Sequence, residues 1–319
     1  MSVTAVIPRL DHRDAMPQHL REAIIAMGNF DGFHRGHQAV VGSAVEWARA
    51  EGRPVIVATF DPHPMRLFQP DTPSFRLTTL DQRQRLFAAA GADAMLVFHF
   101  DEELASKSPE EFIDMLVARL GASGVVTGED FTFGKARSGS VATLRELGEE
   151  AGLRSRAVAP VTGDKGEVIS SSLIRAALQS GDCATATRLL TRPFAVEGVV
   201  QHGDKFGRQL NFPTANLDMS HYLRPAYGIY AVRATLPGGR VVDGAANLGI
   251  RPMIDPPKEL LEPHFFDFSG DLYGQTIEVQ MIAWLRGEGK FDSFDELKHQ
   301  ITLDCDHARQ ILAETPLVA

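Results

Sequence analysis

Cysteine and long apolar runs are both scarce in this sequence. Cys183 and Cys305 are its two cysteines among 319 residues, and they lie far apart. We therefore expect neither a disulfide framework nor a cysteine zinc site. No apolar run approaches the ~20 residues that cross a bilayer, and the start of the chain has no apolar leader segment. These features predict a cytoplasmic protein without a membrane partner.

Positive charge is also in short supply. Lys and Arg number 32 against 41 Asp and Glu, which gives a formal net charge of −9. Nucleic-acid binding depends on basic surface that displaces counterions, so we do not expect that class of partner. Phosphate ligands remain compatible with the composition, because helix ends and metal ions set the field inside a cleft.

The first half of the chain alternates short apolar runs with helical patterns, and 319 residues are more than one ordinary core needs. Expected strands cover residues 24–27, 55–59, 94–98 and 125–126, and expected helices begin near Asp81, Ser108, Val141 and Ser171. This alternation predicts a Rossmann-like α/β domain with a parallel sheet and ligands at the carboxyl ends of its strands.

After Pro193 the apolar pattern changes to a period of two. Expected strands cover residues 196–201, 228–235, 241–242 and 276–285, with a hairpin turn at 237–239. Strands at this spacing predict an antiparallel β-barrel, and Ser293 with Glu296 predicts a capped C-terminal helix.

The passage from one pattern to the other falls in residues 180–195. We therefore predict domains over residues 1–185 and 186–319. The proline-rich residues 252–263 are expected to form a long loop that covers a site.

Residues 26–38 form the most informative segment. They read as a strand, a tight turn and a helix, with His34 and His37 on one face of the first helical turn. Two histidines at this spacing are often an ordinary surface or core feature, but the glycines around them favour a ligand site. Backbone N–H groups and the positive helix end attract phosphate. The phosphate-binding residues that we expect beside the histidines are Gly28, Asn29, Phe30 and Gly36.

Two further segments follow expected strands. Asp61 ends a strand and would lie at the same carboxyl edge, although an aspartate ahead of proline is as often part of a turn. Residues 128–134 contain Asp130 and Phe131, and their aromatic side chains suit a pocket wall or simply a loop between glycines.

The segment 169–175 carries hydroxyls at a helix start and an arginine one turn later. Ser171, Ser172 and Arg175 suit a polyphosphate, because hydroxyls, N–H groups and a guanidinium all bind its oxygens. Helix capping by the serines is the more common explanation when this segment is considered alone.

Together these four segments resemble the FMN adenylyltransferase domain of prokaryotic bifunctional riboflavin kinase/FAD synthetases. The matching segments, in family order, are residues 28–37, 59–64, 128–134 and 169–175. The His-x-Gly-His signature is shared with other adenylyl and cytidylyl transferases, so the combination of segments carries the resemblance. Ser172 stands where the family commonly has threonine.

The resemblance implies attack by an FMN phosphate oxygen on the α-phosphorus of ATP, with release of pyrophosphate and no covalent enzyme intermediate. It implies that His34 and His37 contact the triphosphate. It also implies that Ser171, Ser172 and Arg175 stabilise the departing pyrophosphate.

The resemblance also implies that three residues of the same domain bind the flavin, the ribose or a metal ion. Asp61 and Asp130 would organise Mg²⁺ or ribose. Phe131, beside Asp130, would contact the flavin.

The second half has its own glycine-rich loop. Such a loop with cations can wrap phosphates through backbone N–H groups, although a barrel rich in hairpins contains similar turns. It does not end in lysine and a hydroxyl, so it is not a P-loop. The phosphate-binding residues that we expect here are Gly198, Gly203, Lys205 and Gly207. Thr214 and Asn216 offer neutral oxygens to Mg²⁺ when phosphates supply its other ligands.

This half resembles the riboflavin kinase module along its length. The matching segments are residues 198–216, 228–230, 247–252, 262–268 and 271–274. The resemblance implies a six-stranded barrel that transfers the γ-phosphoryl group of ATP to the 5′-hydroxyl of riboflavin.

The kinase resemblance also assigns roles to single residues. It implies that Glu262 is the general base, that Thr214 and Asn216 hold Mg–ATP, and that Arg251 lies on the flavin side. Without the resemblance, Glu262 would be interpreted as a carboxylate at the rim of a barrel strand.

Two residues depart from the kinase pattern. Asn211 stands where glycine is usual, and Met253 stands where threonine is usual. Asn tolerates positive φ better than most residues, so we expect the turn at Asn211 to survive. Met253 removes a hydroxyl near the flavin-side loop.

These observations predict a bifunctional enzyme that converts riboflavin to FMN and FMN to FAD, with ATP and Mg²⁺ in both steps. Three alternatives remain open at this stage. The first is a monofunctional FAD synthetase whose barrel only binds flavin. The second is a non-catalytic flavin-sensing regulator on the same scaffold. The third is an adenylyltransferase for another phosphorylated substrate, which the match of the barrel disfavours.

Overall fold

The computed structural model describes residues 6–164, 166–203, 210–251 and 258–316. The chain forms two compact units. The first contains residues 1–72 and 80–170, and the second contains residues 73–79 and 171–319. Each unit is described by itself below. The domain limits of 1–185 and 186–319 stay a prediction.

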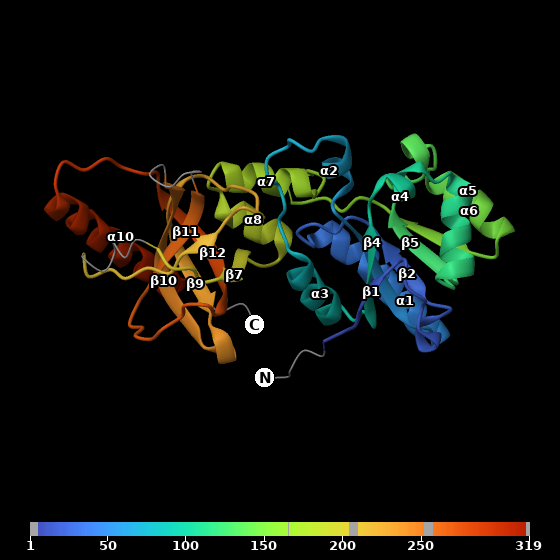
Figure 1. Ribbon diagram of the computed structural model, residues 1–319, viewed down its shortest axis with the longest axis horizontal. Coiled ribbons are helices and arrows are strands. Elements are labelled where there is room, and N and C mark those ends of the chain that lie inside the picture. Colours follow the sequence, from blue (N-terminus) through green and yellow to red (C-terminus); the bar gives the residue numbers. More distant parts are fainter. Residues whose placement is uncertain (1–5, 165, 204–209, 252–257, 317–319) are drawn as a thin grey trace. The chain divides into compact units, whose positions relative to one another are not determined.

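A parallel six-stranded sheet forms the centre of the first unit (Figure 1). Its strand order is β1-β4-β3-β2-β5-β6, and every neighbouring pair is parallel. The strands are β1 (Arg9–Asp11), β2 (Ile24–Met27), β3 (Val55–Asp61), β4 (Ala94–His99), β5 (Gly124–Gly128) and β6 (Arg154–Val158). The predicted Rossmann-like parallel sheet is therefore confirmed.

Helices cover this sheet on both faces, which is why β2 is apolar at every position. Ile24 and Ala26 belong to the core on the side of α1, whereas Ile25 and Met27 belong to the core on the side of α5 and α6. The helices are α1 (Arg35–Glu51), α2 (Pro64–Phe68), α3 (Leu80–Ala89), α4 (Glu102–Ser106), α5 (Pro109–Asp114) and α6 (Val141–Glu150).

The start of α5 shows how closely local sequence determines a helix boundary. Ser108 Oγ accepts a hydrogen bond from Glu111 N at 3.3 Å, and the Glu111 carboxylate accepts one from Ser108 N at 2.7 Å. This reciprocal capping box satisfies two backbone donors that the helix leaves open. The predicted helix start at Ser108 is confirmed.

The second unit is built around an antiparallel six-stranded sheet with the order β7-β12-β9-β10-β11-β8. Its strands are β7 (Phe194–Val199), β8 (Leu217–Asp218), β9 (Gly228–Thr235), β10 (Val241–Arg251), β11 (Lys258–Phe265) and β12 (Thr276–Arg286). An isolated bridge between Gln201 and Asn216 joins the segments beside the two edge strands, so the sheet closes into the predicted barrel.

The helices described beside the barrel are α7 (Ser171–Gln179), α8 (Cys183–Leu190) and α10 (Phe294–Glu314). Helix α8 occupies residues 183–190, half of the segment 180–195 in which we expected the passage between domains. Ser293 caps α10 by accepting from Glu296 N at 3.1 Å, while the Glu296 carboxylate bonds the N–H of Asp292 at 3.0 Å. In the described part of the chain, none of the helices combines the length and apolar character needed to span a bilayer.

The prediction of a long loop over residues 252–263 is wrong for residues 258–263. Residues 252–257 lie outside the described residues, but Lys258–Phe265 is strand β11 and includes Pro263. Pro263 faces Ala246 in the register with β10, and its carbonyl accepts from Ala215 N at 2.9 Å on the other side. A residue's N–H and C=O point to the same side of an antiparallel strand, so the missing N–H does not interrupt the ladder with β10.

One short segment of the N-terminal half packs within the second unit. Residues 73–79 lie between α2 and α3 in the sequence, yet Leu223 N donates to Arg76 O at 2.8 Å and Arg175 Nε donates to Phe75 O at 2.8 Å. Nothing in the local sequence indicates this assignment, because the contacts are made by residues about 100 positions or more away.

Candidate active sites

The turn between β2 and α1 has an unusual backbone. Phe30 and Phe33 have φ values of 48° and 46°, in the left-handed region. That region costs roughly 1–2 kcal/mol for a residue with a Cβ atom, so packing around the turn has to hold it. Both rings are buried, and both contact the ring of Phe87 on α3, with centroids 5.8 and 5.2 Å apart.

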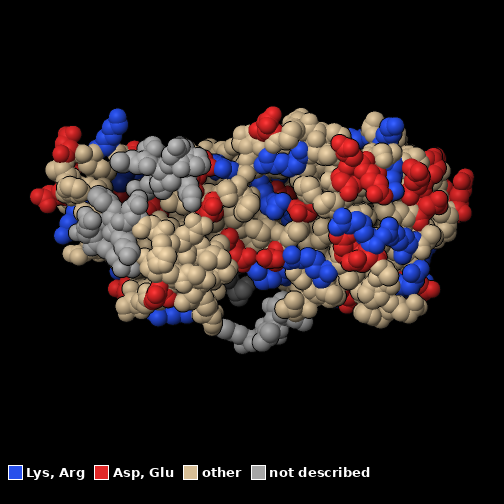
Figure 2. Space-filling model, in the orientation of Figure 1, with Lys and Arg blue, Asp and Glu red and all other residues tan. Residues whose placement is uncertain are grey.

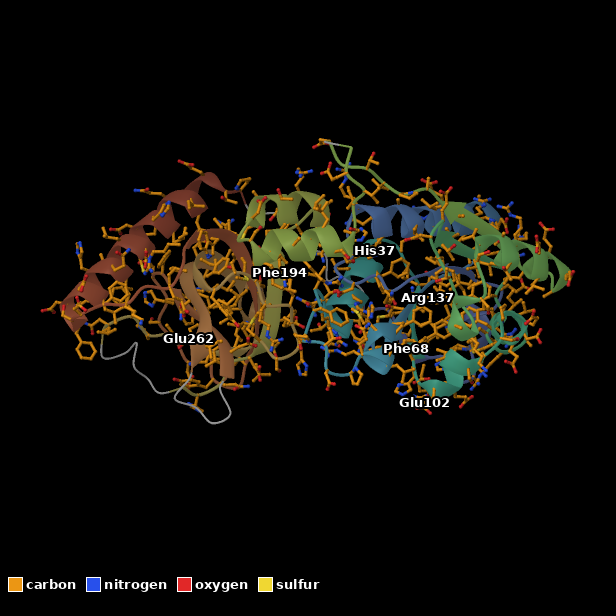
Figure 3. The ribbon with its side chains drawn as sticks, turned by 90° about the horizontal axis from the view of Figure 1, so that it is seen from above. His37, Phe68, Glu102, Arg137, Phe194 and Glu262 are labelled. Atoms are coloured by element: carbon orange, nitrogen blue, oxygen red, sulfur yellow. The ribbon has the colours of Figure 1, made fainter. Side chains whose placement is uncertain are left out.

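His34 and His37 lie together at the start of α1, and Figure 3 labels His37. Their rings stack with centroids 3.6 Å apart, and His34 is 5% exposed. His34 is the N-cap residue, and its Nδ1 accepts from His37 N at 3.3 Å. A neutral imidazole that accepts at Nδ1 carries its proton on Nε2. The neutral His34 ring therefore presents an Nε2–H donor, which suits a phosphate oxygen.

The surroundings of Gly36, which directly precedes His37, leave little room for a side chain. A Cβ atom there would lie 3.1 Å from His34 Cε1 and 3.5 Å from Ile169 O. The ring of His34 and the backbone at Ile169 therefore enclose this position. Ser171 begins α7 only two residues after Ile169.

Ser171, Ser172 and Arg175 all lie on α7, which belongs to the second unit. Within that unit the Arg175 guanidinium contacts Phe75. Its Nε donates to Phe75 O at 2.8 Å, and its Cζ lies 5.2 Å above the centre of the Phe75 ring. Sequence analysis missed this contact.

Asp61 lies at the carboxyl end of β3, and Asp130 and Phe131 follow the carboxyl end of β5, with β2 between these two strands in the sheet. Asp61 is half-buried at the end of β3, opposite His99 at the end of β4. Asp130 is exposed in the turn after β5, and Phe131 beside it is half-buried. Phe131 stacks on Phe133 with ring centroids 5.9 Å apart.

Phenylalanine rings form a continuous chain of contacts through this part of the first unit. Successive centroids lie 5.2–6.2 Å apart. In order of contact, the rings are those of Phe68, Phe100, Phe60, Phe98, Phe112, Phe133 and Phe131. Phe68 on α2 ends this Phe chain and is 68% exposed (Figure 3). An exposed ring beside buried ones can stack on a planar ligand. Phe60, Phe98 and Phe100 lie at or directly after the ends of β3 and β4, which is visible in the sequence, whereas Phe68 and Phe112 lie on helices α2 and α5.

Glu262 lies on β11 in the second unit and is 8% exposed (Figure 3). It pairs with Asn247 of β10 in the antiparallel register. Ala215 N donates to Pro263 O at 2.9 Å, which brings the segment of Thr214 and Asn216 alongside Glu262. Asn247 belongs to a segment that resembles the kinase module, but only the strand register places it opposite the carboxylate.

Asn216 is held closely by the glycine loop. It is 7% exposed, and Gln201 N donates to its carbonyl at 2.9 Å. A Cβ atom on Gly203 would lie 2.6 Å from Asn216 Nδ2, so any side chain at this position would displace the Asn216 amide. Gly198 lies on β7, and Lys205 and Gly207 lie outside the described residues.

The remaining expectations for the barrel concern its flavin-side loops. Asn211 has φ 66°, so it adopts the positive φ that we expected of it. Arg251 ends β10, and its side chain and Met253 lie outside the described residues.

The described residues contain no cluster of three or more His, Cys, Asp or Glu side chains arranged to hold a metal ion. The donors of Thr214 and Asn216 are a hydroxyl and an amide oxygen. Such neutral oxygens fit Mg²⁺ that already carries phosphate ligands. Figure 2 shows acidic side chains gathered over α4, α5 and α6, so local donors rather than the net charge have to attract an anion.

Comparison with known proteins assigns each half of the chain to a family. Residues 16–173 match the FAD synthetase family, and residues 190–312 match the riboflavin kinase family. The bifunctional riboflavin kinase/FMN adenylyltransferase of Escherichia coli (strain K12) is 38% identical over 293 residues, which cover 92% of this chain and 93% of the relative. The chain belongs to the bifunctional riboflavin kinase/FMN adenylyltransferase family.

Two further comparisons extend over the same length. The family member from Bacillus subtilis (strain 168) is 37% identical over 303 residues, covering 92% of this chain and 95% of the relative. A crystal structure from Streptococcus pneumoniae, titled as a macrolide-efflux protein, is 29% identical. It matches with a TM-score of 0.85 and covers 95% of this chain and 99% of its own. The family resemblance inferred from the sequence motifs is confirmed.

Proposed function

We propose that the chain phosphorylates riboflavin to FMN in its second unit and adenylylates FMN to FAD in its first unit, with ATP as the donor in both reactions. The observation that carries this proposal is the presence of one distinct polar site in each unit. The His34–His37 pair begins α1 of the parallel sheet, and Glu262 lies beside Thr214 and Asn216 in the barrel.

In the first unit an FMN phosphate oxygen attacks the α-phosphorus of ATP, the bond to the β-phosphate oxygen breaks, and pyrophosphate leaves. The enzyme has to align two anions and neutralise the charge that develops. The positive end of α1, the turn residues Gly28, Asn29 and Phe30, and the two histidines supply donors for the triphosphate. Ser171, Ser172 and Arg175 stabilise the departing pyrophosphate.

The flavin of FMN is a planar, largely apolar ring system. We assign it to the Phe chain, where Phe131 and the exposed ring of Phe68 offer stacking surfaces. Asp61 and Asp130 at the same sheet edge bind polar groups of the substrates or Mg²⁺.

In the second unit the 5′-hydroxyl of riboflavin attacks the γ-phosphorus of ATP, and ADP leaves. Glu262 accepts the hydroxyl proton, which requires a carboxylate within hydrogen-bond reach of that hydroxyl. Asn247, opposite Glu262 in the register, can orient the carboxylate by donating to it. The glycine loop binds the phosphates, and Arg251 contacts the flavin side.

Mg²⁺ belongs to this proposal in both units. In the barrel, Thr214 and Asn216 would hold it together with ATP, and the ion would neutralise charge on the transferred phosphoryl group. Chelation by EDTA should stop both reactions and added Mg²⁺ should restore them. We further propose that the protein works in the cytoplasm, where ATP is available, which cell fractionation tests.

One assay separates this function from its alternatives. The purified chain is incubated with riboflavin, ATP and Mg²⁺, and the flavins are resolved by chromatography. Formation of FMN and FAD supports the bifunctional enzyme. FAD formed only from supplied FMN indicates a monofunctional synthetase, and no turnover indicates a flavin-sensing regulator.

A further inference from the structure

The strongest unassigned feature is a buried arginine behind the histidine turn. Arg83 lies in the middle of α3 and is 2% exposed. Its Nη2 donates to Asp31 Oδ1 at 3.4 Å, and Asp31 is likewise 2% exposed. The motifs that define the adenylyltransferase site do not include Arg83.

The Arg83 guanidinium joins three separate parts of the first unit. Its Nη1 donates to Asn29 O at 3.3 Å, in the turn after β2, and to Thr59 Oγ1 at 3.1 Å, on β3. Thr59 Oγ1 in turn donates to the same Asn29 carbonyl at 2.7 Å. The planar group therefore contacts a backbone carbonyl, a hydroxyl and a carboxylate from two separate nitrogens, Nη1 and Nη2. Lysine has three N–H donors but a single nitrogen, so it would have to reach all three acceptors from one point.

These contacts fix the turn between β2 and α1, whose backbone includes a residue in the left-handed region. Asn29 and Asp31 flank Phe30, which has φ 48°. The ring of Phe30 also contacts His37 edge-on, with centroids 5.3 Å apart. A displacement of the turn at Asn29 would therefore be passed to the histidine pair through Phe30.

Stability alone does not account for a buried ion pair at this place. Removing two charges from water is costly, and apolar residues of similar volume are often as good for folding. Asp31 belongs to the proposed phosphate-binding turn itself, and Arg83 bonds it from α3.

We propose that Arg83 is a positioning residue for adenylyl transfer. Through Asn29, Thr59 and Asp31 it holds the turn, and with it the histidine pair, in the shape that receives the triphosphate of ATP. This inference rests on the proposed function of the first unit.

The first test is Arg83→Lys, which keeps the charge and removes the fork. Misplacement of the turn should lower kcat/KM for FAD formation from FMN by about 10- to 100-fold. The KM for ATP should rise while the KM for FMN stays unchanged. A variant that is merely less stable has fewer folded molecules, which lowers the maximal rate and changes neither KM. The matched control is Arg85→Lys, the same substitution at an exposed position of the same helix.

Riboflavin phosphorylation by the same preparations provides an internal reference, because that reaction belongs to the other unit. It should stay within about twofold of the wild type. Equal loss of both activities in Arg83→Lys, or an unchanged KM for ATP, overturns the positioning role. A wild type without FAD formation would instead refute the proposed function itself.

A second variant keeps the inference testable if Arg83→Lys does not fold. Thr59→Val removes the hydroxyl that bridges Arg83 and Asn29 and leaves the ion pair in place. It should reduce kcat/KM for ATP in adenylyl transfer by about 2- to 10-fold, the loss expected for one hydrogen bond. A folded Thr59→Val variant with wild-type kinetics would contradict the proposal.

Discussion

The two proposed phosphate sites are built in different ways. In the first unit the proposed site residues His34, Gly36 and His37 come from one continuous strand–turn–helix connection. In the second unit the residues come from separate strands, and the register of β10 with β11 brings Asn247 opposite Glu262. A local motif can therefore identify the first site, whereas the second depends on which strands pair. If the sites are independent, single substitutions should separate the two activities.

The largest expected effect is that of Glu262→Gln. Loss of the general base should lower riboflavin phosphorylation by about 10²- to 10⁴-fold. FAD formation from supplied FMN should remain, because the carboxylate belongs to the other unit. Both rates can be followed by chromatography of the flavins. Glu314→Gln, at an exposed position of α10, is the control. Retention of FMN formation in Glu262→Gln would refute the assignment of the base.

The converse separation is expected of His37→Ala. Removing a donor to the transferring phosphates should lower FAD formation by about 10²- to 10³-fold. Phosphorylation of riboflavin should continue at the wild-type rate. His19→Ala, at an exposed position of the same unit, controls for the loss of an imidazole. Loss of both activities in folded His37→Ala would show that the two sites are not independent.

Arg175→Ala tests the leaving-group role of α7. Loss of one guanidinium contact should cost roughly 2–4 kcal/mol of transition-state stabilisation in FAD formation. The measurement is kcat/KM for adenylyl transfer. Phe75→Leu is a useful companion, since it removes the ring beneath the guanidinium but keeps the arginine and the carbonyl bond. A loss confined to the KM for FMN would contradict the pyrophosphate role.

The smallest effect concerns acid stability of the first unit. The Arg154 guanidinium donates to both Glu51 carboxylate oxygens at 2.7 and 2.6 Å, and with Trp47 it lowers the pKa of Glu51 from 4.5 to about 2. A lowered carboxyl pKa stabilises the folded state above the unfolded value. This contribution is lost as the pH falls from about 4.5 to about 2.

Glu51→Gln lacks this titration, so its deficit in unfolding temperature should shrink as the pH falls through that window. Thermal unfolding followed by tryptophan fluorescence measures the deficit, because Trp47 bonds Glu51 directly through Nε1 at 2.6 Å. A deficit that does not vary with pH would mean that the pair contributes nothing through ionisation.

Local sequence determined the elements with strong periodicity or complete caps. The apolar strand β2, the capped start of α5 at Ser108 and the hairpin before β10 are all where their residues predict them. The reason is that these signals lie within one or two turns of chain. The motifs of the first site are of the same kind, since a strand, glycines and two histidines follow one another directly.

Other elements were decided by distant partners. Strand β6 has exposed arginines and is a strand because it pairs with β5 at a sheet edge, and Pro263 is accepted in β11 because its missing N–H does not face β10. The helical pattern around Arg83 is polar, so the sequence does not indicate that this residue is buried. Its burial and its three contacts depend on residues of other elements. The sequence therefore determined the two families and the fold classes. Tertiary structure alone decided strand register and buried ion pairing, because both depend on residues far apart in the chain.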